Sequence, residues 1–152
     1  MIEIKESQEL NETNLLSYRG KVRQVELEQI GKEMDSYVQQ MGAKSVKTPI
    51  TATYAAIGDT VDIEILMPVN KVIDSTDKFA FKSQIKITNA VVVAYKGHPM
   101  GLQEACNELN QYIAEHKLQP ITVGYNVTKN MDTLNLENTE IDVYVGISPN
   151  IL

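Results

Sequence analysis

Two acidic residues, Glu64 and Asp142, are candidates for chemistry because each lies within a short run of alternating apolar and polar residues. Such alternation is typical of a β-strand with one buried face, and it places both carboxylates on the less apolar face. If that face lines a groove, two carboxylates can share a proton or hold a cation, and one of them should titrate with a raised pKa because like charges disfavour the second ionisation. The alternative is that both are solvated charges on an exposed sheet face.

Tyrosines form the second candidate set. Tyr18 and Tyr95 each precede a basic residue and a glycine, Tyr54 and Tyr125 each lie five residues after a proline, and Tyr144 follows Asp142 in the same alternating run. Tyrosines in strands can line a groove with apolar rings and hydrogen-bonding tips, or they can pack in the core with hydroxyls bonded locally. The candidate ligand-binding residues are therefore Tyr54, Glu64, Tyr125, Asp142 and Tyr144.

No other residues point to catalysis or metal binding. His98 and His116 lie near the two ends of one predicted helix without metal-ligand spacing, and the single cysteine, Cys106, lies within that helix and is expected to be a small buried apolar residue. The sequence has no glycine-rich phosphate loop, nucleophile elbow or calcium loop. We expect no catalytic residues, no metal site and no cofactor.

Charge and hydropathy narrow the partners. The 152 residues carry 20 acidic and 14 basic side chains, a net charge of −6, whereas binding to nucleic acid needs clustered basic residues. The first residues lack the apolar core of a signal peptide, and no apolar run approaches the ~20 residues of a membrane span. We expect a cytoplasmic protein with no nucleic-acid or membrane partner.

Four short motifs recur in the same order and indicate an internal duplication, with one copy at about 13–69 and the other at about 90–147. Tyr18-Arg19-Gly20 recurs as Tyr95-Lys96-Gly97, Ser36-Tyr37-Val38 as Gln111-Tyr112-Ile113, Pro49-Ile50-Thr51 as Pro120-Ile121-Thr122, and Ile63-Glu64-Ile65 as Ile141-Asp142-Val143. Each copy has the order strand, helix, strand, strand, so we expect a single domain over 1–152 built from two pseudo-repeats.

Apolar periodicity locates the elements. Stripes at three- to five-residue steps predict helices over about 22–41 and 100–117, and alternation predicts strands over 60–69, 139–147 and 78–87. The polar stretch 70–77 is the expected linker between the repeats, and 129–138 is expected to be a mobile loop, either a lid or a plain surface loop.

The order Ala90-Val91-Val92-Val93-Ala94-Tyr95-Lys96-Gly97, then a helix, then Gln119 to Tyr125, then Thr139 to Ile147 resembles the GyrI-like effector-binding domains. The resemblance covers about residues 13–148. It implies an α+β fold in which duplicated β-α-β-β units form a curved, mainly antiparallel sheet with two helices on one face, and a ligand groove between the repeats.

The sequence departs from the family pattern at one position. In the family a buried glutamate that binds lipophilic cations usually lies two residues before the tyrosine that Tyr125 resembles, and this sequence has Val123 there. The absence of that carboxylate argues against cationic ligands and against an enzyme. The chain also lacks a helix-turn-helix segment, so we do not expect it to contact DNA itself. The sequence favours a non-enzymatic module that holds a small, mostly apolar ligand. The alternative is a protein-interaction module that sequesters or escorts a partner protein. The sequence is also compatible with a homodimer.

Overall fold

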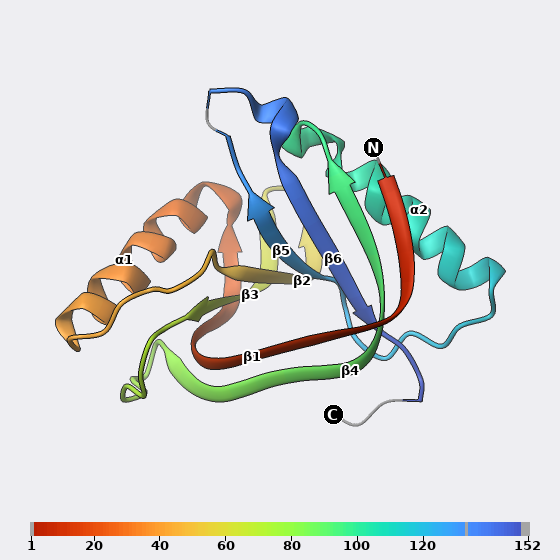
Figure 1. The fold of residues 1–152 in the computed structure, drawn as a ribbon. Helices are drawn as coiled ribbons and strands as arrows, with labels where there is room; N and C mark the ends of the chain where they lie inside the picture. The colour runs from red at the N-terminus through yellow and green to blue at the C-terminus, as the bar shows by residue number, and fades with distance from the viewer. Residues whose placement is uncertain (1, 133, 150–152) are drawn as a thin grey trace. The chain divides into compact units, whose positions relative to one another are not determined.

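The computed structural model describes residues 2–132 and 134–149. In these residues the chain forms six strands and two α-helices, which is the α+β class that the sequence predicts (Figure 1). In chain order they are β1 (Ile2–Arg23), α1 (Leu27–Gln40), β2 (Ile50–Ile57), β3 (Thr60–Pro68), β4 (Ala80–Lys96), α2 (Leu102–Glu115), β5 (Tyr125–Asn130) and β6 (Glu140–Gly146). None of the helices among these residues has the length and apolar character that crossing a membrane requires.

The chain divides into two compact units. Residues 12–85 form one, called here the α1 unit, and residues 1–11 with 86–152 form the other, the α2 unit. The long strands β1 and β4 each contribute one part to either unit. Each unit therefore contains the strand, helix, strand, strand order that the repeats predict.

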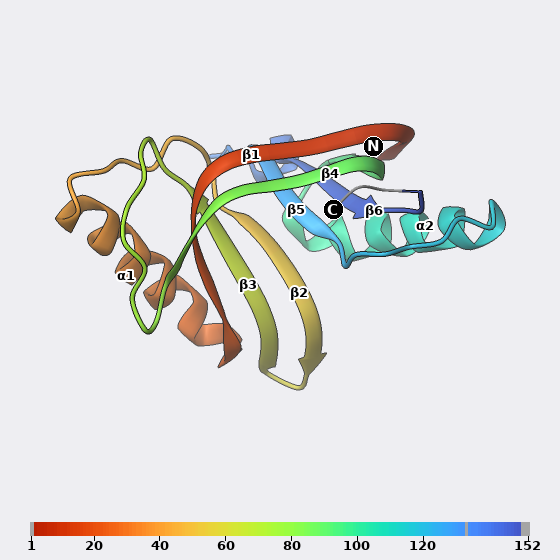
Figure 2. The ribbon, with the colours of Figure 1, turned by 90° about the horizontal axis from the view of Figure 1, so that it is seen from below.

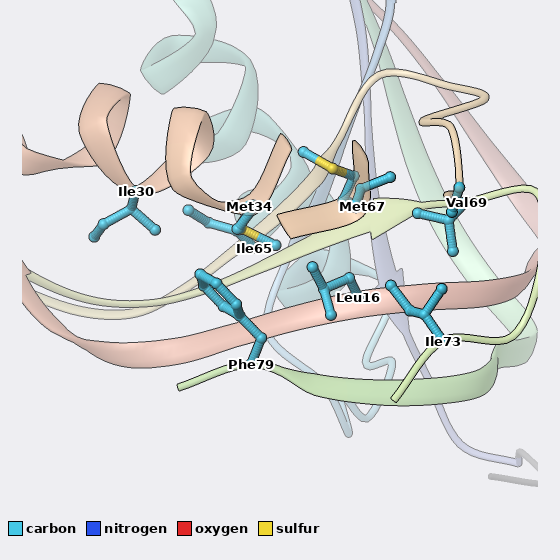
Figure 3. Close-up of a cluster of buried hydrophobic side chains, with 10 residues drawn as sticks. Leu16, Ile30, Met34, Ile65, Met67, Val69, Ile73 and Phe79 are labelled. Atoms are coloured by element: carbon cyan, nitrogen blue, oxygen red, sulfur yellow. The ribbon is translucent and has the colours of Figure 1, made fainter. Parts of the chain in front are cut away.

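In the α1 unit, β3 pairs antiparallel with both β1 and β2. Helix α1 lies against one face of this sheet (Figure 2) because its buried stripe of Ile30, Met34 and Val38 contacts apolar strand residues such as Leu16 and Ile65. Figure 3 shows Ile30 and Met34 of the helix beside Leu16 and Ile65 of the strands. The predicted apolar stripe of this helix is confirmed at these three positions.

The α2 unit follows the same plan, with β6 paired antiparallel to β4 and β5. The buried residues of α2, Ala105, Leu109 and Ile113, pack against Val93 and Val143 of the strands. At the start of this region His98 caps a short 3-10 turn by accepting a hydrogen bond from the Met100 amide at 3.1 Å, and Pro99 takes the first position. The side chain of His98 therefore caps this turn.

The first helix begins later than predicted. Val22 is the penultimate residue of β1, and Val25 lies in a single 3-10 turn, Gln24–Glu26, with 73% of its surface exposed. Neither valine belongs to the buried stripe of α1. The spacing of these valines matched the stripe, but β1 extends to Arg23 because it pairs with β3 as far as Thr60.

The prediction that residues 70–77 link the two repeats is also wrong. Residues 70–77 lie inside the α1 unit, where Ile73 is buried in the core and Asp74 accepts a 2.6 Å hydrogen bond from the Tyr37 hydroxyl through its carbonyl. The chain instead passes between the units within β1 and β4. The predicted strand 78–87 is the first part of β4, which continues without interruption to Lys96.

The segment 129–138 is partly regular, since β5 continues to Asn130 and Leu136–Asn138 form a 3-10 turn. Its large apolar side chains lie outside the core: Met131 is 52% exposed and Leu134 is 97% exposed. The mobility of this segment stays a prediction.

Candidate functional site

The sheet of the α1 unit has a face that α1 does not cover, and this helix-free face carries Glu64. Alternation along β3 directs Ile65 and Met67 toward α1, and therefore directs Glu64 to the opposite side. Residues paired directly across antiparallel strands point the same way, so Arg19 of β1 and Ala52 of β2, both paired with Glu64, share its face.

The carboxylate of Glu64 is buried and fully engaged. The residue is 4% exposed, so the interpretation of Glu64 as a solvated surface charge is wrong. Its Oε2 accepts hydrogen bonds from the Ser17 hydroxyl at 2.7 Å and from the Lys82 ammonium at 2.5 Å, and its Oε1 accepts one from the Tyr54 hydroxyl at 3.3 Å. These donors satisfy the buried charge, which burial alone would make costly.

Those contacts determine whether the pKa of Glu64 is raised or lowered. Burial raises the pKa of this carboxyl, but the hydrogen bonds from Lys82, Ser17 and Tyr54 and the charge of Lys82 outweigh burial and hold the pKa below its ordinary value. The raised pKa expected for one member of a carboxylate pair is therefore not found at Glu64. Its close neighbour is an ammonium, which favours the ionised form.

Tyr54 connects Glu64 with a second ion pair on the same face. The ladder between β2 and β3 is irregular at Tyr54, between Thr53 and Ala55, and the tyrosine is 40% exposed. The Arg19 guanidinium lies over its ring, 3.8 Å from the centroid, and is ion-paired with Asp62. A small hollow of about 170 Å³ continues from Asp62, lined also by Lys21, Ala55, Ile57 and Thr60.

The helix-free face of the α2 unit carries the other three predicted residues. Tyr125 of β5 pairs directly with Tyr144 of β6, and both rings pack partly buried against a cluster of Leu10, Ile87, Ala90 and Val92. Asp142 lies on the same face because it is two residues from Tyr144 along β6, and its carboxylate is 3.4 Å from the Lys129 ammonium. A larger hollow in this unit, about 340 Å³, lies elsewhere, between the start of β1 and α2, and is lined by Ile2, Ile4, Glu108, Gln111, Tyr112 and Glu115.

The strand registers support one predicted match and correct another. In each hairpin the register shifts at one position, just after Thr53 in β2 and just after Thr128 in β5. Thr53 pairs with Ile63 and Thr128 pairs with Ile141. Glu64 and Asp142, the next residues after these isoleucines, therefore occupy corresponding places. By the same criterion Tyr54 corresponds to Lys129, which lies four residues after Tyr125. The prediction that Tyr54 and Tyr125 are matched is wrong, because the proline motifs and the strands that follow them are offset differently in the two copies.

The tyrosines of the repeated Tyr-basic-Gly motif lie on the helix side of each sheet. Tyr18 packs in the α1 core, edge-on to Phe79, and Tyr95 packs in the α2 core. Each hydroxyl lies above the glycine of its motif, where a Cβ on Gly20 or Gly97 would approach it to 2.7 Å. The motif is therefore a packing device, which was the alternative interpretation of these two tyrosines.

Sequence reasoning missed the partners that neutralise the two carboxylates, Lys82 and Lys129, and the hydroxyl of Ser17. The alternation of side chains along β1 could have indicated Ser17. Ser17 directly precedes Tyr18, which faces the helix, so Ser17 faces the helix-free side. Nothing in the sequence pairs Lys82 with Glu64, since that contact depends on how distant strands meet.

No known family model matches the chain, and no curated protein matches it significantly in sequence. Solved structures do match. The EcmrR C-terminal domain superposes with a TM-score of 0.76 at 17% identity, covering 97% of this chain and 97% of that one. SAV2435 bound to tetraphenylphosphonium matches with a TM-score of 0.54 at 8% identity over 98% of this chain and 94% of that one. A hydrolase from Listeria innocua matches with a TM-score of 0.55 at 14% identity over 97% and 91%.

These likenesses show the fold. The chain has the fold of the EcmrR C-terminal domain, and the α+β class that the resemblance implied is confirmed. It spans 57% of the longer EcmrR chain seen in an EcmrR–DNA complex, which it matches with a TM-score of 0.70 at 17% identity.

Proposed function

We propose that the chain is a non-enzymatic binding module for a small, neutral, mostly apolar ligand. Each unit offers a candidate site on its own helix-free sheet face, with Tyr54 and Glu64 in the α1 unit and Tyr125, Asp142 and Tyr144 in the α2 unit. One observation carries the proposal. Each carboxylate among these residues has a lysine of its own unit beside it, Lys82 at 2.5 Å from Glu64 and Lys129 at 3.4 Å from Asp142. A ligand therefore meets aromatic rings and internally neutralised charge.

The fold supports binding in general. SAV2435, which shares the fold, is described in complex with a small molecule, tetraphenylphosphonium. Because a fold hosts many functions, the choice of ligand has to come from the residues of this chain. The tyrosines provide large apolar surfaces with polar tips, which suit orientation of an apolar molecule with few polar groups.

The chemistry of Glu64 argues against catalysis. A general base needs an accessible lone pair and a pKa near the operating pH. Both oxygens of Glu64 already accept hydrogen bonds, and its pKa is held below the ordinary value, so it is a weak base. A protein of the same fold is called a hydrolase. The proposal for this chain rests on its own Glu64, whose engaged oxygens and lowered pKa do not suit a general base.

A fluorescence titration tests the proposal. The neutral, environment-sensitive dye Nile red should bind the purified chain, and Tyr125→Ala and Tyr144→Ala should each weaken binding at least fivefold, because each removes a ring from the helix-free face of the α2 unit. Tyr37→Ala, which alters a tyrosine on helix α1, is the matched control and should leave binding unchanged. Unchanged binding in both test variants, with intact far-UV circular dichroism, would contradict the proposed site.

A second candidate function is binding of a partner protein. It is favoured by apolar side chains that stand in solvent in the α2 unit, namely Leu134 at 97% exposure, Met100 at 87% and Met131 at 52%. Exposed leucine and methionine side chains are common at adaptable protein-binding surfaces. Substitution of all three by serine should abolish such an interaction and leave Nile red binding intact.

A further inference from the structure

The ion pair on the helix-free face of the α1 unit is unequal in its exposure. The Glu64 side chain is 6% exposed, whereas the side chain of its partner, Lys82, is 45% exposed. The carboxylate is a fixed part of the sheet, while the ammonium reaches it from a long side chain whose remainder is in contact with water.

The fixed part of this arrangement resembles a cation-binding site without its cation. The Ser17 and Tyr54 hydroxyls hold the Glu64 carboxylate in place from two sides, at 2.7 and 3.3 Å. Both donors are neutral, so they orient the carboxylate without compensating its charge. A buried carboxylate needs a cation nearby, and within the described residues the cation that touches Glu64 is the Lys82 ammonium.

We infer that Lys82 is a tethered cation that fills an ammonium subsite formed by Glu64, Ser17 and Tyr54, and that it thereby excludes positively charged ligands and sets the preference for neutral ones. This inference rests on the proposed function, since it specifies the charge class of the ligand. It identifies Lys82 as a specificity-determining residue. Removal of its ammonium should open the subsite to a small primary ammonium of similar size.

Chemical rescue tests the inference. The Lys82→Ala variant leaves a space beside Glu64 in which n-butylammonium can take the position of the lost side chain. We expect n-butylammonium, followed by isothermal titration calorimetry and by the thermal unfolding midpoint, to bind Lys82→Ala at least tenfold more tightly than the wild-type chain and to raise the midpoint of the variant alone. A ligand that binds only the folded state stabilises it by an amount that grows with the logarithm of the ratio of ligand concentration to Kd. The uncharged n-butanol is the probe control.

Two further variants make the result decisive. The double variant Glu64→Gln with Lys82→Ala should lose the gain, because the carboxylate is gone. Lys32→Ala, which alters a lysine paired with Glu28 on the exposed surface of α1, should show no gain. If Lys82→Ala does not fold on its own, n-butylammonium should restore its far-UV circular dichroism signal, and n-butanol should not; failure of both to restore the signal would overturn the inference.

Equal binding of n-butylammonium to the wild-type chain and to the Lys82 variant would overturn the inference, as would a gain that survives Glu64→Gln. The proposed function is judged separately by Nile red. Nile red binding without a gain in ammonium binding contradicts only the role of Lys82, while a gain without Nile red binding supports the subsite and contradicts the neutral-ligand function.

Discussion

Replacement of Lys82 by methionine should destabilise the chain in a way that depends on pH. The substitution keeps an apolar stem of similar length and removes the ammonium that lies 2.5 Å from Glu64. Removal of one partner of a buried ion pair costs about 3–5 kcal/mol, because a buried charge is left without compensation. Lys82 itself is 45% exposed and water can partly replace it, so we expect a smaller loss of about 2 kcal/mol at neutral pH. For a chain of this length that corresponds to a fall of about 4–8 °C in the unfolding midpoint.

The sign of the pH dependence follows from the Glu64 pKa. In the wild-type chain this pKa lies below its ordinary value of 4.5, so ionised Glu64 contributes stability above pH 4.5, and that contribution is lost as the pH falls through the lowered pKa. In Lys82→Met burial is no longer opposed by an ammonium, and the carboxyl takes up a proton more readily. The difference in stability between the two proteins should therefore be full at pH 7 and shrink as the pH falls below 4.5.

Circular dichroism melts of both proteins at several pH values between about 3.5 and 7 measure this difference. Lys32→Met, which breaks an exposed pair on α1, should move the midpoint little at any pH. The reasoning is refuted if Lys82→Met has the same unfolding midpoint as the wild-type chain at pH 7. It is also refuted if the difference in midpoint between the two proteins is as large at the lowest pH as at pH 7.

Three other predictions concern packing and partners. Met34→Ala should lower the free energy of unfolding in urea by about 2–5 kcal/mol, because Met34 is fully buried on the inner side of α1 and its truncation leaves a cavity (Figure 3). A loss below about 1 kcal/mol would contradict this packing. Gly101→Ala should destabilise by about 1–3 kcal/mol, because its Cβ would overlap the Tyr95 hydroxyl, and adding Tyr95→Phe should recover part of the loss; no recovery would place the strain elsewhere. With a net charge of −6, the chain should not bind duplex DNA at physiological salt, and salt-sensitive micromolar binding in a fluorescence anisotropy titration would refute this.

Elements with strong local patterns could be predicted from the sequence. The stripe Ile30, Met34 and Val38 and the alternation around Ile65 and Ile141 identify the buried faces, because burial imposes the period of the helix or strand on the residue types. The start of α1 could not be located in this way, because Val22 and Val25 fit the helical stripe by spacing, and only the pairing of β1 with β3 decides against them.

Long-range pairing explains the other errors. Residues 5–14 of β1 lack clear alternation of apolar and polar side chains, and residues 70–77 are mostly polar although Ile73 is buried. Neither segment therefore reveals its place in the fold from its local sequence. In the candidate site, the correspondence of Glu64 with Asp142 could be predicted because both lie in short alternating runs. The lysines beside them could not, since an ion pair between distant strands leaves no pattern within either strand.

The most direct test of the account is a map of where a neutral ligand binds. Nile red displacement selects a neutral, apolar compound, and this compound is titrated into the ¹⁵N-labelled chain while amide chemical shifts are followed. The account predicts that the largest shift changes fall on the strand residues of the helix-free faces, at Tyr54 and Glu64 or at Tyr125, Asp142 and Tyr144, with small changes along the solvent-facing sides of α1 and α2. Saturable shift changes confined to the helices, or to the hollow around Tyr112, would contradict it.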